Sequence, residues 1–144
     1  KPLDVCLVLG EPARELLERG VGRPAGESVW SSILAVADRE GLVHLAVLSP
    51  GDEYYSLCSC CRCCCQELGA LLTHGRKNWI RKADLVAATD GSLCTACGTC
   101  VERCPFGARV AVDGETRFDS DSCYGCGLCV SACPPGAISM APRG

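Results

Sequence analysis

The sequence has few aromatic residues, no excess of positive charge and no long apolar run. Aromatic side chains make up 5% of its 144 residues, and the formal net charge is -3. A nucleic-acid-binding protein would present a basic surface, so this class is excluded. No apolar stretch approaches the ~18 residues that a membrane span requires. We therefore expect no nucleic-acid partner and no membrane span.

Several other signals are also missing. The glycines between Glu18 and Gly26 lack the lysine and the G-x-G-x-x-G spacing of a phosphate-binding loop. The length fits one compact domain or two small ones, which excludes a large multi-domain enzyme. No secretory signal is evident, and a thiol-rich chain survives best in a reducing compartment. We therefore expect a cytoplasmic protein.

Cysteine is the residue type that the chain has in abundance. There are 15 cysteines, a level typical of disulfide scaffolds or metal carriers. Six lie between Cys58 and Cys65, where adjacent thiols cannot readily pair, and eight form two regular runs. This arrangement favours metal ligation over disulfide bonding.

The two regular runs are copies of one motif. Each reads C-x-x-C-x-x-C-x-x-x-C-P, and the neighbouring glycines and alanines recur as well, which indicates a repeated supersecondary unit. The first motif holds Cys94, Cys97, Cys100 and Cys104, and the second holds Cys123, Cys126, Cys129 and Cys133.

This spacing is the one that bacterial iron–sulfur proteins use, in which the fourth cysteine ligates the other cluster. A tight loop with a ligand at every third residue can wrap three corners of an Fe₄S₄ cube, and the last corner must come from elsewhere. We assign one [4Fe-4S] cluster to a first cysteine set and the other to a second cysteine set. The first set is Cys94, Cys97, Cys100 and Cys133, and the second is Cys123, Cys126, Cys129 and Cys104. Zinc, bound by C-x-x-C pairs, and disulfides are the alternatives, and neither needs a crossed fourth ligand.

On these residues, the segment from Ser92 to about Met140 resembles a bacterial-type dicluster ferredoxin. The resemblance implies a pseudo-twofold (βαβ)₂ fold, two [4Fe-4S] clusters, one-electron transfer and redox protein partners. The fold class we predict is α+β, with this ferredoxin-like module at residues 91–144. A small α/β cysteine-rich region is predicted at residues 1–90.

The region before the two motifs shows ordinary α/β patterning. The apolar run at 5–9 predicts a strand, and helices are predicted from Pro12 to Gly20, over 28–40 and over 66–72. A buried strand is predicted over 42–48 and another strand over 85–88. Asp113-Gly114, flanked by apolar residues, predicts a hairpin over 111–118.

Parts of this region resemble segments found ahead of the dicluster module in a family of larger prokaryotic 4Fe-4S ferredoxin-type proteins. The segments are residues 1–10, 41–44 and the run from Cys58 to Cys65. In those relatives further cysteines, including a C-x-C-R element, precede the part that matches Lys1. Because this chain begins at Lys1 without a methionine, we expect a fragment of a longer protein.

The run from Cys58 to Cys65 predicts a third metal centre. Cys58, Cys61 and Cys64 repeat the C-x-x-C-x-x-C spacing, and Cys6 or another cysteine of the run can supply the fourth ligand. If the segment is helical, residues three apart share a face. A third iron–sulfur cluster, a zinc site and redox-active thiols all remain open. Cys6 on its own favours a buried structural cysteine.

Few other residues point to chemistry. His44 and His74 are interpreted as packed or surface residues rather than ligands. The rings of Tyr54, Tyr55, Tyr124 and Phe106 are expected to pack near the clusters.

Two functions follow from the motifs. The first is one-electron transfer as a ferredoxin or electron-relay subunit, with the acidic charge steering it toward basic faces of oxidoreductases. The alternative is an oxidoreductase whose substrate-reacting metal centre lies in the run from Cys58 to Cys65. The sequence leaves open whether the protein is an enzyme.

Overall fold

The computed structural model describes residues 2–51 and 53–144, and it divides into two compact units. The first unit is Lys1–Cys61 and the second is Arg62–Gly144. The sequence predicted a boundary near residue 90 instead. The architecture is a mixed α and β one, with three small sheets in the described part of the chain.

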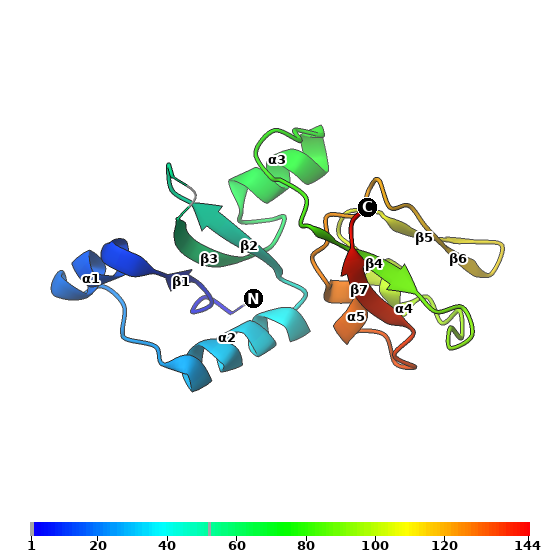
Figure 1. Ribbon diagram of the computed structural model, residues 1–144, viewed down its shortest axis with the longest axis horizontal. Helices are drawn as coiled ribbons and strands as arrows, with labels where there is room; N and C mark the ends of the chain where they lie inside the picture. The colour runs from blue at the N-terminus through cyan, green and yellow to red at the C-terminus, as the bar shows by residue number, and fades with distance from the viewer. Residues whose placement is uncertain (1, 52) are drawn as a thin grey trace. The chain divides into compact units, whose positions relative to one another are not determined.

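The first unit is built on a three-stranded antiparallel sheet (Figure 1). Its strands are β1 (Leu7–Val8), β2 (Val43–Leu48) and β3 (Tyr54–Cys60), in the order β1-β3-β2. β3 is therefore the central strand, and it carries Cys58 opposite Leu45 of β2. The register shifts between Val47 and Leu48, and the residues of β2 are exposed from Ala46 onward. The predicted strand over 42–48 is confirmed, although only its first part is buried.

Two helices complete the first unit: α1 (Gly10–Glu18) and α2 (Glu27–Arg39). Both helix predictions are confirmed to within a few residues. Ala37 of α2 packs with Val5 and Leu42 in a small buried core. β1 is shorter than the predicted strand, and Cys6 is exposed. The interpretation of Cys6 as a buried structural cysteine is therefore wrong, because Val5 occupies the buried position beside it.

The second unit starts with α3 (Gln66–His74), which confirms the predicted helix and ends at Gly75 with a φ of 64°. Leu68 and Leu71 are its buried residues. The elements that follow are β4 (Leu85–Thr89), α4 (Thr99–Glu102), β5 (Arg109–Val112), β6 (Glu115–Phe118), α5 (Leu128–Ser131) and β7 (Ile138–Pro142).

The strands of the second unit form two antiparallel pairs, β4 with β7 and β5 with β6 (Figure 1). β4 precedes the first motif and β7 follows the second, so the β4–β7 pair joins the two ends of the repeat. The predicted hairpin is the β5–β6 pair. Asp113 and Gly114, with φ of 52° and 81°, form its turn, and two positive φ values are what a type I′ turn requires.

The core of the second unit contains cysteines as well as aliphatic side chains. Its buried residues are Ala87, Cys100, Ala108, Cys123 and Ile138. Eight partly buried cysteine or apolar side chains pack against them. This unit therefore has little aliphatic core of its own. No helix in the described residues is long and apolar enough to cross a membrane.

Candidate metal centres

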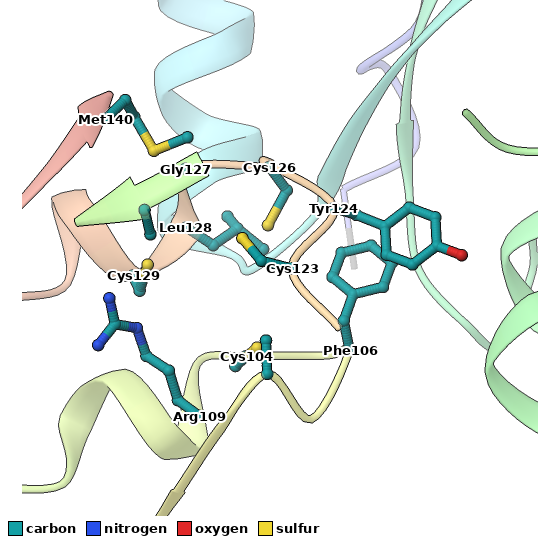
Figure 2. A pocket seen from close by; sticks show the side chains of 12 residues that line it. Cys104, Phe106, Arg109, Cys123, Tyr124, Cys126, Gly127, Leu128, Cys129 and Met140 are labelled. Carbon is teal, nitrogen blue, oxygen red and sulfur yellow. The ribbon is translucent and has the colours of Figure 1, made fainter. Parts of the chain in front are cut away.

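Four cysteines from both motifs line one cavity in the second unit, which we call the second cavity. They are Cys104, Cys123, Cys126 and Cys129. Figure 2 shows their side chains on different sides of a common space. Cys104 comes from the end of the first motif, whereas the other three come from the second. This grouping is the second cysteine set.

The other four cysteines of the motifs line a separate cavity, which we call the first cavity. They are Cys94, Cys97, Cys100 and Cys133, and they make up the first cysteine set. Each cavity thus takes three cysteines from one motif and the last cysteine of the other. Ligation by these thiols stays a prediction, but the fold brings together the residues that the spacing groups.

The two loops owe their shape to residues with positive φ. Gly98 and Gly127 have φ of 78° and 76° and precede α4 and α5. These short helices then carry Cys100 and Cys129. A left-handed residue at this point turns the chain sharply, which only glycine does without strain.

An aspartate stabilises the start of each loop. Asp90 Oδ1 accepts hydrogen bonds from the Ser92 backbone N–H at 2.8 Å and from the Ser92 hydroxyl at 2.6 Å. Asp119 Oδ1 accepts from the Asp121 backbone N–H at 2.9 Å, and its Oδ2 accepts from the Ser122 hydroxyl. These bonds lower the pKa of both carboxyl groups. The two aspartates therefore shape the loops.

Arg143, Ala83 and Lys82 hold the loop of the second motif. Arg143 donates from Nη2 to the Cys123 carbonyl at 2.9 Å and from Nε to the Ala83 carbonyl at 3.1 Å. The Ala83 N–H donates to the Tyr124 carbonyl at 3.1 Å. Lys82 Nζ donates to the Asp121 carbonyl. Sequence reasoning missed this set of contacts, because residues far apart in the chain make it and no local pattern marks it.

The second cavity has an apolar lining. Phe106 and Tyr124 stack with ring centroids 4.6 Å apart, and Figure 2 shows them at one end of the cavity, with Met140 and Arg109 at the other. The prediction that these two rings pack near the cluster ligands is confirmed. Tyr54 and Tyr55 are exposed side chains of β3 in the first unit.

The thiols of the two sets have different environments. Burial raises the pKa of the Cys126 thiol to about 11. Burial also raises the pKa of Cys129, and the nearby positive charge of Arg109 opposes this shift. Cys97 is exposed, and a hydrogen bond with Thr99 lowers its pKa. Two cysteines of the first set are thus exposed to solvent, whereas none of the second set is exposed.

The donors fit an iron–sulfur group. Thiolates are the ligands of such clusters, and none of the eight cysteines forms a disulfide in the described structure. Each cavity is lined by four of these cysteines, which is the number of thiolate ligands that a four-iron cluster takes.

Comparison with known protein families agrees with this geometry. Residues 87–134 match the model of the 4Fe-4S dicluster domain, a segment that includes all eight cysteines of the two sets. The matched segment, a third of the chain, is thereby defined as a metal-binding iron–sulfur domain of the electron-transfer type. None of the curated proteins matches the chain.

A third group of thiols lies in the turn between β3 and α3. The sulfur atoms of Cys61, Cys63 and Cys64 lie within 4.8 Å of one another. The helical alternative for this run is wrong, because Cys58 and Cys60 belong to strand β3 and a turn follows them.

The other residues considered for a third site lie elsewhere. Cys58 Sγ is 3.7 Å from the Ser56 hydroxyl, and Cys6 precedes β1. Neither joins the group of three thiols in the described structure. His44 Nδ1 lies 3.1 Å from the Ser59 hydroxyl, as a packed histidine does, and His74 is exposed at the end of α3.

Proposed function

We propose that the second unit transfers single electrons through two [4Fe-4S] clusters. In this proposal the first set of cysteines holds one cluster and the second set holds the other. The observation that carries it is the crossed grouping of the cysteines around two cavities. The proposed arrangement of elements is a pseudo-twofold (βαβ)₂ unit, and the order β4, α4, β5, β6, α5, β7 supports it.

The clusters supply a reversible one-electron change of charge. The residues of this chain bind them, orient them and limit access of water. The Phe106–Tyr124 stack and Met140 keep the second cavity apolar. The glycines and aspartates of the loops hold the thiols in place before metal arrives, so that few bonds must rearrange on binding.

Electron exchange with a partner is proposed to take place beside the first cavity. Cys94 and Cys97 of that cavity are exposed, whereas Cys123 is buried in the second. A protein that docks there comes closer to a cluster than one that docks beside the shielded loop. The partner class is a redox protein with a basic face, because the chain is acidic and thiolate ligands add negative charge. Exposed thiols of this kind favour a reducing, cytoplasmic setting.

Metal and sulfide analysis of anaerobically purified protein, with EPR spectroscopy, tests this function. Two four-iron clusters require about eight iron and eight sulfide per chain and EPR signals from two reduced clusters. Zinc without iron or sulfide would contradict the proposal, as would disulfides within the two sets. Metal bound by only one of the two cysteine sets would also contradict the proposal.

A third metal centre at Cys61, Cys63 and Cys64 is a second proposal. Their mutual distance of within 4.8 Å supports it, since three sulfur atoms at this spacing can share one metal ion. Iron with sulfide would make the centre part of the electron path, or the substrate-reacting centre of an oxidoreductase. Zinc would make it structural.

The double variant Cys61→Ser with Cys63→Ser tests this second proposal. It should lower the metal content per chain and leave both EPR signals of the second unit unchanged. Unchanged metal content would end the proposal. An iron centre with an open coordination position would show a spectral change with cyanide or carbon monoxide, and full thiolate ligation would not.

A further inference from the structure

The two repeats of the second unit differ at one buried position. In each repeat a Gly-Ala pair follows the last cysteine and leads into a strand. Arg109 then opens β5 in the first repeat, and Ile138 opens β7 in the second. Both side chains are buried, with exposures of 3% and 5%. An arginine thus occupies the position at which the other repeat places an aliphatic side chain.

The Arg109 guanidinium lies between the two cavities and lines both of them. Its Nη1 donates to the Thr89 hydroxyl at 3.0 Å, and its Cζ lies 4.6 Å from the centroid of the Phe118 ring. Its Nε and Nη2 are buried, and neither makes a hydrogen bond of ordinary geometry in the described structure. The Cys129 thiol lies beside the guanidinium, and its interaction with Arg109 opposes the rise in the Cys129 pKa. Two donor atoms of this buried cation are therefore available to the sulfur atoms of the second cavity.

A buried cation is costly unless it faces negative charge and its N–H groups are hydrogen-bonded. Both cavities offer such charge only when their cysteines hold metal as thiolates. Arg109 is also the only cationic side chain among the residues that line either cavity. The chemistry of the site thus points to an anionic, sulfur-rich group as the missing partner.

We propose that Arg109 is a potential-setting residue, which donates hydrogen bonds to the sulfur atoms in the second cavity and raises the reduction potential of the cluster held there. This inference rests on the proposed function. Charge and hydrogen bonding at the sulfur atoms are among the factors that set the potential of such clusters. Reduction adds one electron from a redox partner and no proton, so the cavity gains one negative charge that the guanidinium stabilises.

The effect is larger in the second cavity than in the first. Figure 2 shows the Arg109 guanidinium beside Cys129 at the edge of the second cavity. This cavity is apolar and shielded, so the charge is weakly screened there. In the first cavity, Cys94 and Cys97 are exposed to water, which screens the same charge. The two clusters therefore differ in potential although their motifs are the same.

Anaerobic redox titration of the full chain, monitored by EPR, tests this role. The variants are Arg109→Met, Arg109→Gln and Arg109→Lys, with Arg117→Met as a matched control. Arg117 is an exposed arginine on the same hairpin. The Cys104→Ser variant identifies the signal of the second cavity, because its loss removes one ligand of that set only.

Loss of the charge should lower the equilibrium constant for reduction in the second cavity at least tenfold, which is 59 mV for one electron. Arg109→Met and Arg109→Gln should both show this shift. Arg109→Lys keeps the positive charge and should show a smaller shift. Arg117→Met should leave the potential within error of the unsubstituted protein. The signal of the first cavity should shift less than that of the second.

An unchanged potential in both neutral variants with intact clusters would overturn the inference. So would loss of the second cluster in the Lys variant as well as in the neutral ones, because retained charge would then not restore the site. Loss of the second cluster in Arg109→Met and Arg109→Gln, with the cluster kept in Arg109→Lys, would support the inference. The unsubstituted protein is analysed for iron first, so absence of clusters there would refute the proposed function itself and with it this inference.

Discussion

Replacement of Gly125 by alanine should destabilise the loop of the second motif. Gly125 has a φ of 77°, and a Cβ at this position would overlap the backbone oxygen of Leu85 and lie 2.9 Å from the Ala83 Cβ. Left-handed backbone costs alanine about 1–2 kcal/mol. Overpacking against backbone adds about 1–3 kcal/mol. We expect the closed loop to lose about 2–5 kcal/mol of stability in total. This corresponds to at least about a 30-fold rise in the population of the open loop.

Gly127→Ala separates the two contributions. Gly127 lies in the same loop with a φ of 76°, and a Cβ there meets nothing within 4 Å. It should show the backbone strain of about 1–2 kcal/mol without the overlap. The reverse change, Ala96→Gly, is made at the equivalent position of the first motif, where Ala96 already has a φ of 53°. It should not weaken the first loop.

The assay is the rate of cluster loss to excess iron chelator under anaerobic conditions, followed by EPR. When opening and closing are fast, this rate follows the population of the open loop. Gly125→Ala should lose the second cluster at least about 30 times faster than the unsubstituted protein and keep the first. Equal rates for Gly125→Ala and Gly127→Ala would refute the reasoning from the Leu85 overlap.

The remaining predictions concern ligands, pH and the loop contacts. Cys104→Ser should abolish the EPR signal of the second motif's cluster and keep that of the first motif, to which Cys104 belongs in sequence. The opposite result would contradict the exchange of the last cysteine between the two motifs. Because burial raises the pKa of Cys126 to about 11, iron must displace a proton from this thiol at any lower pH. Cluster affinity should therefore rise up to about tenfold per pH unit for each such thiol between pH 6.5 and 7.5, as measured by chelator competition, and a flat profile would be inconsistent with this. Arg143→Met removes hydrogen bonds to carbonyls of both the second loop and the segment beside it. It should destabilise that loop by about 1–3 kcal/mol, seen as faster loss of the second cluster only.

The regular elements were largely predictable because local signals set them. The Asp113-Gly114 pair predicts the hairpin turn, and the structure places both residues at positive φ. Periodic apolar residues predict α2, and Ala37 on that face is fully buried. These signals lie within a few residues of one another, so a sequence shows them directly.

Long-range contacts account for what the sequence did not reveal in the first unit. β3 contains Tyr54 and Cys58 rather than an apolar alternation, and the sequence predicts metal ligands from Cys58 onward but no strand. It is a strand because β1 and β2 pair with its two edges. The exposure of Cys6 depends in the same way on where β1 begins.

The site contains residues that local sequence signals predict and residues that only long-range contacts bring there. The spacing of the eight cysteines predicts their grouping, because ligands at every third residue must face a common centre. Arg109 was missed, although a comparison of the two repeats marks it, since Ile138 is its counterpart. Arg143 carries no such signal, because its partners Ala83 and Cys123 meet it only in the folded chain.

Anomalous diffraction at the iron absorption edge, from anaerobically grown crystals, places metal atoms against named cysteines. We expect two four-iron sites in the second unit. One should lie against Cys133 together with the first three cysteines of the first motif, and the other against Cys104 together with those of the second. Iron sites that each contact the four cysteines of a single motif would contradict the account, as would scattering that identifies zinc.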